Sequence, residues 1–250
     1  MNGAEGFISH LIELRDRLLK AVGALLLVFF VLFYWARDIY TLLAAPMIAE
    51  LPEGATMIAI EVAAPFFVPI KVTLFASLIV ALPFVLYQIW AFIAPGLYTH
   101  EKRLVVPLIA TSTILFLVGC LFAYLIVFPT VFHFVAAFTP DGVEMNTDIQ
   151  KYFDFVLTLF LAFGLAFETP IAVVILTRMG IVSIEKLKES RPYVIVGAFV
   201  IAAIFTPPDV ISQLLLAFPI WILYEVGLFI SGILEKKAGR EEGKDDMEGD

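Results

Sequence analysis

The chain has 250 residues, of which 61% are hydrophobic and 16% are charged, and its mean hydropathy is +0.97. Soluble domains are about 45–50% apolar and about 25% charged, so this composition excludes an ordinary soluble domain and predicts a lipid bilayer as the solvent. The net charge of −8 and the lack of a basic patch argue against a nucleic-acid partner. The single Cys120 excludes a disulfide within one chain.

Six apolar segments are predicted to be membrane-spanning helices, because a bilayer core of about 30 Å needs about 20 apolar helical residues. They are residues 18–36, 69–92, 104–128, 153–177, 193–205 and 211–232. The fifth reaches only about 20 Å, which predicts local bilayer thinning or a partly embedded hairpin formed by the last two spans. Residues 1–232 are thus expected to form one all-α transmembrane domain, followed by a charged, disordered cytoplasmic tail over residues 233–250.

The lysine and arginine residues predict the orientation of this domain. All 16 except Arg37, Lys71 and Lys151 lie at the start of the first span, after the sixth, or in the loops after the second and fourth spans. Positive loops stay in the cytoplasm, so both ends of the chain are expected to be cytoplasmic in a bacterial inner membrane. Prolines inside four spans predict kinks that curve the helices into a cupped, concave bundle.

Enzyme signatures are missing from the sequence. It contains neither a P-loop nor a G-x-S-x-G elbow, and the H-E-x-x-H pattern that begins at His100 fails at Leu104. We therefore expect no enzyme activity, no catalytic residue, no metal and no cofactor.

Two cytoplasmic segments contain candidate binding residues. Residues 9–18 are predicted to form an amphipathic helix in which Glu13 either pairs with Arg17, four residues later, or binds a ligand. Residues 92–103 hold Phe92, a Pro-Gly turn and then Glu101. This loop is either an interfacial connector, with Glu101 favoured at a helix start, or a second part of a binding site.

Acidic residues within or beside the spans are further candidates. Glu168 lies about 15 Å from the cytoplasmic end of the fourth span, where an ionisable side chain is costly and is expected to face protein or water. Its alternative role is that of a structural acid beside a kink at Pro170. Glu225 in the sixth span is similar but nearer the cytoplasm. Asp209 is expected to cap the sixth helix or to contact a partner.

Four motifs occur in order along the chain: residues 10–15 (HLIELR), residues 92–98 followed by Glu-Lys-Arg at 101–103, residues 191–193 (RPY) and residues 206–209 (TPPD). With the six-span pattern they resemble the TatC family over nearly the whole chain, from about Phe7 to Gly232. One departure is residues 188–190, where the family has a more basic run.

The resemblance implies a receptor and core scaffold of the twin-arginine translocase, which exports folded proteins with the proton-motive force. It implies that Glu13 and Glu101 bind the two arginines of a signal peptide, with Phe92 beside them and Arg15 in the same motif as Glu13. Carboxylates suit this task because they form charge-assisted, often bidentate pairs with guanidinium groups.

The resemblance also implies partners within the membrane. Glu168 matches a buried acid that meets polar groups of a single-span subunit, and Pro46 and Asp209 match outer-face positions important for translocation. Gln213 and Glu225 belong to the sixth span, which with the fifth is expected to bind TatA-like and TatB-like subunits; other copies of the chain are expected partners too. The alternative function is a proton-coupled small-molecule transporter with Glu168 as the proton carrier.

Overall fold

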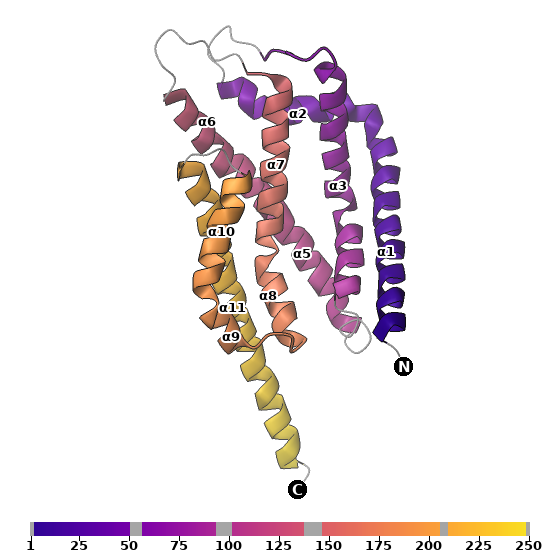
Figure 1. Ribbon diagram of the computed structural model, residues 1–250, viewed down its shortest axis with the longest axis vertical. Helices are drawn as coiled ribbons and strands as arrows, with labels where there is room; N and C mark the ends of the chain where they lie inside the picture. Colours follow the sequence, from indigo (N-terminus) through magenta and orange to yellow (C-terminus); the bar gives the residue numbers. More distant parts are fainter. Residues whose placement is uncertain (1–2, 51–56, 94–101, 138–146, 206–209, 249–250) are drawn as a thin grey trace.

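The computed structural model describes residues 3–50, 57–93, 102–137, 147–205 and 210–248, and these are almost entirely helical (Figure 1). The elements are α1 (Gly3–Leu32), the 3-10 turn η1 (Phe33–Trp35), α2 (Ala36–Glu50), α3 (Ala64–Ile93), α5 (Lys102–Phe122), the π-helical turn η2 (Ala123–Val127), α6 (Phe128–Ala137), α7 (Ile149–Phe167), α8 (Thr169–Arg178), α9 (Ile184–Glu189), α10 (Arg191–Phe205) and α11 (Val210–Glu248). The predicted all-α class is confirmed.

Five helical stretches are long and apolar enough to cross a membrane, and each contains or largely covers a predicted span. They are Ile8–Ala45, Ala64–Ile93, Val105–Phe132, Ile149–Arg178 and Gln213–Lys236. The remaining apolar helix is α10, whose 15 residues reach about 22 Å and match the short fifth segment. The protein is therefore a multi-pass membrane protein.

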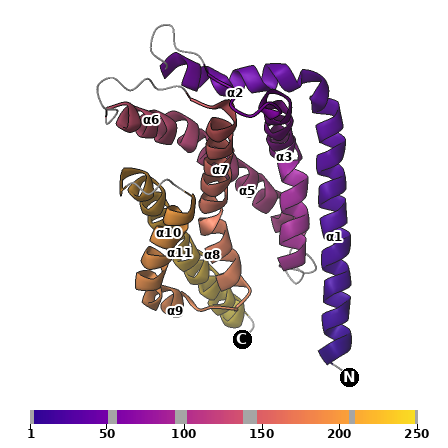
Figure 2. The same cartoon turned by 45° about the horizontal axis from the view of Figure 1, so that its top comes forward.

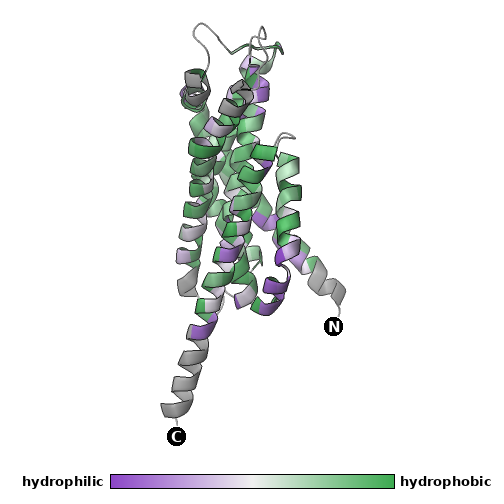
Figure 3. Ribbon diagram, turned by 90° about the vertical axis from the view of Figure 1, so that its left-hand side faces the viewer, coloured by the Kyte–Doolittle hydropathy of each residue, from purple (hydrophilic) through white to green (hydrophobic). Residues whose placement is uncertain are grey.

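The helices form an open row rather than a closed ring. At one edge α1 packs along α3, and at the other α10 packs along α11, with α5, α7 and α8 between them (Figure 1). Helix α2 turns away from α1 and lies across the end of the bundle next to α3 (Figure 2). Apolar residues extend along the middle of the helices, and polar residues gather toward their ends (Figure 3).

One region differs from the sequence-based expectation. The tail over residues 233–250 was expected to be disordered, whereas the backbone of α11 continues as helix to Glu248. Its many Glu and Lys residues are good helix formers, and the preceding span supplies a helix that they extend without a costly nucleus.

Packing against α7 forms the main core. Phe128, Phe153, Leu159 and Phe163 are fully buried or nearly so. At the N-terminal end of α7, Ile58 and Asp148 form an isolated bridge, with Ile58 donating its N–H to Thr147 O at 3.0 Å and accepting from Ile149 N at 2.9 Å. This bridge ties the segment before α3 to the start of α7.

Candidate functional site

The first candidate site lies at the start of α1, where Glu13 is half-buried. Its Oε1 accepts hydrogen bonds from Arg17 Nε at 2.8 Å and from Arg17 Nη2 at 2.6 Å. His10 Nδ1 lies 3.9 Å from Glu13 Oε2, beyond hydrogen-bond distance. The pairing within the helix, one of the two predicted alternatives for Glu13, is thus present.

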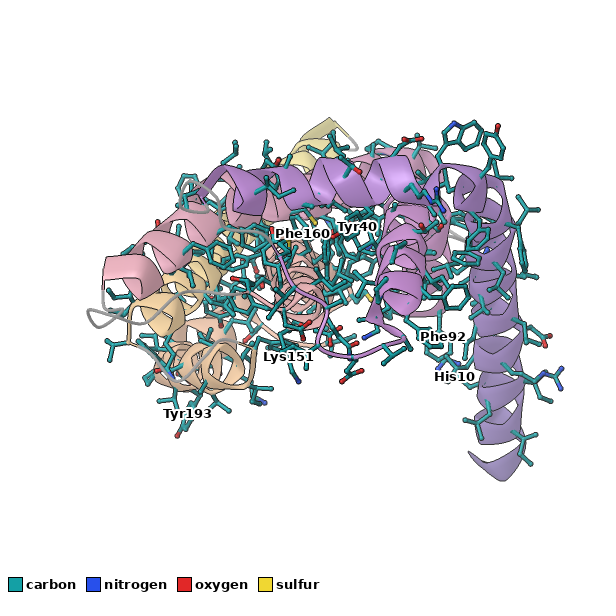
Figure 4. The ribbon with its side chains drawn as sticks, turned by 90° about the horizontal axis from the view of Figure 1, so that it is seen from above. His10, Tyr40, Phe92, Lys151, Phe160 and Tyr193 are labelled. Carbon is teal, nitrogen blue, oxygen red and sulfur yellow. The ribbon has the colours of Figure 1, made fainter. Side chains whose placement is uncertain are left out.

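Phe92, near the end of α3, joins this site through His10. The two rings are stacked, with 4.4 Å between their centroids and 17° between their planes. Figure 4 shows both side chains between α1 and α3. The packing of α1 along α3 therefore brings together two of the segments that the sequence singled out, whereas Glu101 lies outside the described residues.

Arg15 lies on a different face of α1 from Glu13. Its Nε and Nη2 donate to Asp16 Oδ1 at 3.0 and 2.8 Å, and both side chains are largely exposed. Residues two apart on a helix point in different directions, so the structure does not bring Arg15 and Glu13 together.

The second candidate site surrounds Glu168, which lies between α7 and α8 and is only 9% exposed. Ser112 Oγ in α5 donates to Glu168 Oε2 at 2.7 Å, and Trp90 Nε1 in α3 donates to Ser112 Oγ at 2.9 Å. Glu168 Oε1 is buried and has no hydrogen-bond partner in the described part of the chain. Three helices thus converge on one carboxyl group, and half of that group remains unsatisfied.

Local sequence explains why the helices meet there. Pro170 lies two residues after Glu168 and has no N–H to donate to the preceding turn. Helix α7 therefore ends and α8 begins at this point. Helix α5 crosses α7 closely at two glycines. A Cβ on Gly119 would lie 2.5 Å from Phe163 O, and one on Gly164 would overlap the ring of Phe116. Small residues at a helix crossing permit such close approach.

The remaining predicted residues that the structure describes belong to other helices, α2 and α11. Glu225 in α11 pairs with Arg191 Nη2 at the start of α10 at 2.7 Å. Gln213 is half-buried in the first turn of α11. Pro46 belongs to α2, and Asp209 lies outside the described residues.

Sequence reasoning missed Trp90 and Ser112, the two side chains that hold Glu168. Ser112 stands in a run of three hydroxyl residues inside a predicted span, and this run was the only available signal. It also missed the ion pair between Lys71 and Asp154, whose Nζ and Oδ1 are 2.7 Å apart across α3 and α7. Over the described residues, no three His, Cys, Asp or Glu side chains are grouped to hold a metal ion.

Comparison with known proteins identifies the family of the chain. The sequence model of the family described as Sec-independent protein translocase protein (TatC) matches residues 9–219. A TatC protein of Azotobacter chroococcum mcd 1 is 59% identical over 222 residues, which cover 89% of this chain and 87% of the relative. A TatC protein of Escherichia coli strain K12 is 55% identical over 236 residues, which cover 94% of this chain and 92% of the relative.

The fold is also similar to a crystal structure described as the twin arginine translocase receptor TatC. The TM-score is 0.79 at 42% sequence identity, and the match covers 90% of this chain and 98% of the other. The family match extends over most of the chain, and the similarity in fold accompanies high sequence identity. The chain belongs to the TatC family of Sec-independent protein translocase proteins.

Proposed function

We propose that this protein is the receptor and core scaffold of a twin-arginine translocase, and that it binds the signal peptide where α1 begins and α3 ends. The observation that carries the proposal is the stacking of His10 on Phe92, which brings the Glu13 carboxylate and an aromatic ring to the same end of the bundle. The similarity to a twin arginine translocase receptor supports it further.

The chemistry of Glu13 suits a guanidinium ligand. A carboxylate offers about four lone-pair positions, and Arg17 engages only Oε1. Oε2 therefore retains capacity to accept from an arginine of the peptide. We propose that Glu101 receives the other arginine, and that Phe92 contacts the apolar residue that follows them.

Arg15 has an indirect role in this proposal. Its charge would repel an arginine of the peptide, but it is paired with the Asp16 carboxylate. The Arg15–Asp16 pair has no net charge, and on the same helix Glu13 still offers its Oε2, which Arg17 does not engage.

The membrane-embedded residues are proposed to serve the partners. Glu168 would meet a polar group of a single-span TatA-like or TatB-like subunit, and Gln213 and Glu225 would lie at sites for these subunits along α10 and α11. Pro46 and Asp209 are proposed to act in translocation at the outer face. Further copies of the chain would complete an assembly driven by the proton-motive force.

We also propose six spans, with α10 as a short fifth, in the bacterial inner membrane and with both termini in the cytoplasm. The start of α1 and the end of α11 lie at the same end of the bundle (Figure 1), which fits an even number of crossings. Most of the lysine and arginine residues also belong to the segments expected at that end.

Binding of a labelled twin-arginine signal peptide to the detergent-purified chain tests the proposal. Glu13→Ala and Glu101→Ala should each weaken binding about 10-fold or more, because a hydrogen bond to a charged group contributes about 1.5–3 kcal/mol. Glu185→Ala is the control, since it removes an exposed carboxylate from α9, outside the two segments of the proposed site. A peptide with two lysines should also bind less well, because an ammonium group cannot form the two-pronged pair. If the wild-type chain does not bind the peptide, a proton-coupled small-molecule transporter becomes the favoured function.

A further inference from the structure

We propose that Ser112 and Trp90 are positioning residues for Glu168, and that they leave Oε1 as the oxygen that carries the proton and makes any further hydrogen bond. The proposal rests on the proposed function only in taking Glu168 as an acid that translocation uses. It concerns two residues on other helices and the direction of the hydrogen bonds that they form.

The three side chains form a buried chain of hydrogen bonds. Trp90 is 7% exposed, Ser112 is 0% exposed and Glu168 is 9% exposed. The distances are 2.9 Å from Trp90 Nε1 to Ser112 Oγ and 2.7 Å from Ser112 Oγ to Glu168 Oε2. The Trp90 end of this hydrogen-bonded series lies in an apolar cluster, where Trp90 packs among buried residues that include Phe116 and Ile171.

The direction of the bonds follows from the donors available. An indole N–H can only donate, so Trp90 makes the Ser112 oxygen an acceptor. The serine hydroxyl has a single proton, and this proton goes to Glu168 Oε2.

The neighbours of Ser112 show that this direction is not the default in α5. Thr111 and Thr113 donate their hydroxyl protons to Pro107 O at 2.8 Å and Ile109 O at 2.7 Å within the same helix. Hydroxyl residues inside helices commonly bond back in this way. Ser112 instead donates across the helix interface to Glu168.

With Ser112 donating to it, Glu168 Oε2 is an acceptor, and the proposal takes this direction to hold in both protonation states of the carboxyl group. When the group is protonated, its proton lies on Oε1, which then acts as a donor. When it is ionised, Oε1 is the oxygen without a donor in the described part of the chain. In both states a polar group that reaches this site meets Oε1, because Oε2 is already engaged by Ser112.

Infrared spectroscopy of the purified full-length chain with isotope-labelled glutamate tests the proposal. The difference between wild type and Glu168→Gln isolates the bands of this carboxyl group in either protonation state. Ser112→Ala should shift these bands, upward for the carbonyl stretch of a protonated group, because Oε2 loses its donor. Trp90→Phe keeps the ring and removes the N–H, and should cause a smaller shift in the same direction, since linked hydrogen bonds polarise one another.

Two variants serve as controls for the infrared measurement. Thr111→Ala removes a hydroxyl that bonds only within α5 and should leave the Glu168 bands in place. Ser112→Thr keeps the hydroxyl and should retain the wild-type bands. Unchanged bands in a folded Ser112→Ala protein would overturn the proposal. Should that variant fail to fold, unchanged bands in Trp90→Phe would overturn it equally.

Export of a twin-arginine cargo provides the functional readout. Ser112→Ala should lower the export rate several-fold in the wild-type background and cause no further loss beside Glu168→Gln. Equal losses in both backgrounds would indicate that Ser112 does not act through Glu168, and would contradict the proposal. The infrared experiment needs neither peptide nor partner, so a failure of the receptor function leaves its result interpretable.

Discussion

His10 and Phe92 stack with 4.4 Å between their ring centroids, and this contact joins the first turns of α1 to the last turn of α3. His10 also lies beside Glu13 on the same helix face. The contact therefore connects an anionic residue of one predicted binding segment with the aromatic residue of the other. Through His10 it limits the distance between Glu13 on α1 and Phe92 on α3 in the proposed peptide site.

Loss of this stacking should weaken peptide binding without unfolding the protein. Aromatic pairs contribute about 0.5–1.5 kcal/mol beyond the area they bury, so His10→Ala should raise the Kd of the signal peptide about 2- to 10-fold. Phe92→Leu should have an effect at least as large, because Phe92 also contacts the peptide in our proposal. Phe66→Leu, at the opposite end of α3 and 64% exposed, should leave the Kd unchanged.

Asp148 should stabilise the start of α7. It caps α7 by accepting from Gln150 N at 3.4 Å, and it also accepts from Ile60 N at 3.4 Å. Asp148→Ala should lower the free energy of unfolding by about 1–2 kcal/mol, as lost helix caps do, and should lower the melting temperature of the purified protein. Lys151→Ala, an exposed change in the same turn, is the control, and an equal loss there would contradict a specific role of Asp148.

The crossing of α5 and α7 should tolerate no side chain at Gly119. A Cβ there would lie 2.5 Å from the Phe163 carbonyl oxygen, so the helices must separate. Gly119→Ala should cost about 1–3 kcal/mol of stability, and it should disturb the Glu168 infrared bands because Ser112 lies on the same helix. A Cβ on Gly23 in α1 would have no neighbour within 4 Å, so Gly23→Ala should leave the stability unchanged or raise it slightly.

The orientation is testable by cysteine labelling in a Cys120→Ser background. Val62→Cys, at a fully exposed position before α3, should react with a membrane-impermeant maleimide added to spheroplasts. Lys236→Cys in α11 should react only after the membrane is permeabilised. The opposite pattern would show that both ends of the chain lie outside the cytoplasm.

Local patterns predicted much of this architecture correctly. The apolar segments, the short α10 and the spacing of Glu13 and Arg17 all depend on residues near one another in sequence, and all are present in the structure. The burial of Glu168 also followed from its place within an apolar span. Helix ends were less accurate, since α1 and α11 extend well beyond the apolar residues that a bilayer requires.

Contacts between helices could not be predicted from the sequence. Trp90 and Ser112 are far from Glu168 along the chain, and both belong to segments that resemble any apolar span. Their meeting depends on the close crossing at Gly119 and Gly164, which in turn depends on how three helices pack. The stacking of His10 on Phe92 likewise requires that α1 and α3 lie side by side.

The most direct test of the account is a double-mutant cycle between Glu13 and the signal peptide. The Kd is measured for wild type and Glu13→Gln against peptides in which each arginine in turn is replaced by glutamine. For one of the two arginines, the account predicts a coupling energy of about 1.5 kcal/mol or more, equivalent to a deviation from additivity of about 10-fold. Effects that add within about 0.5 kcal/mol for both arginines would show that Glu13 binds neither, and would contradict the proposed site.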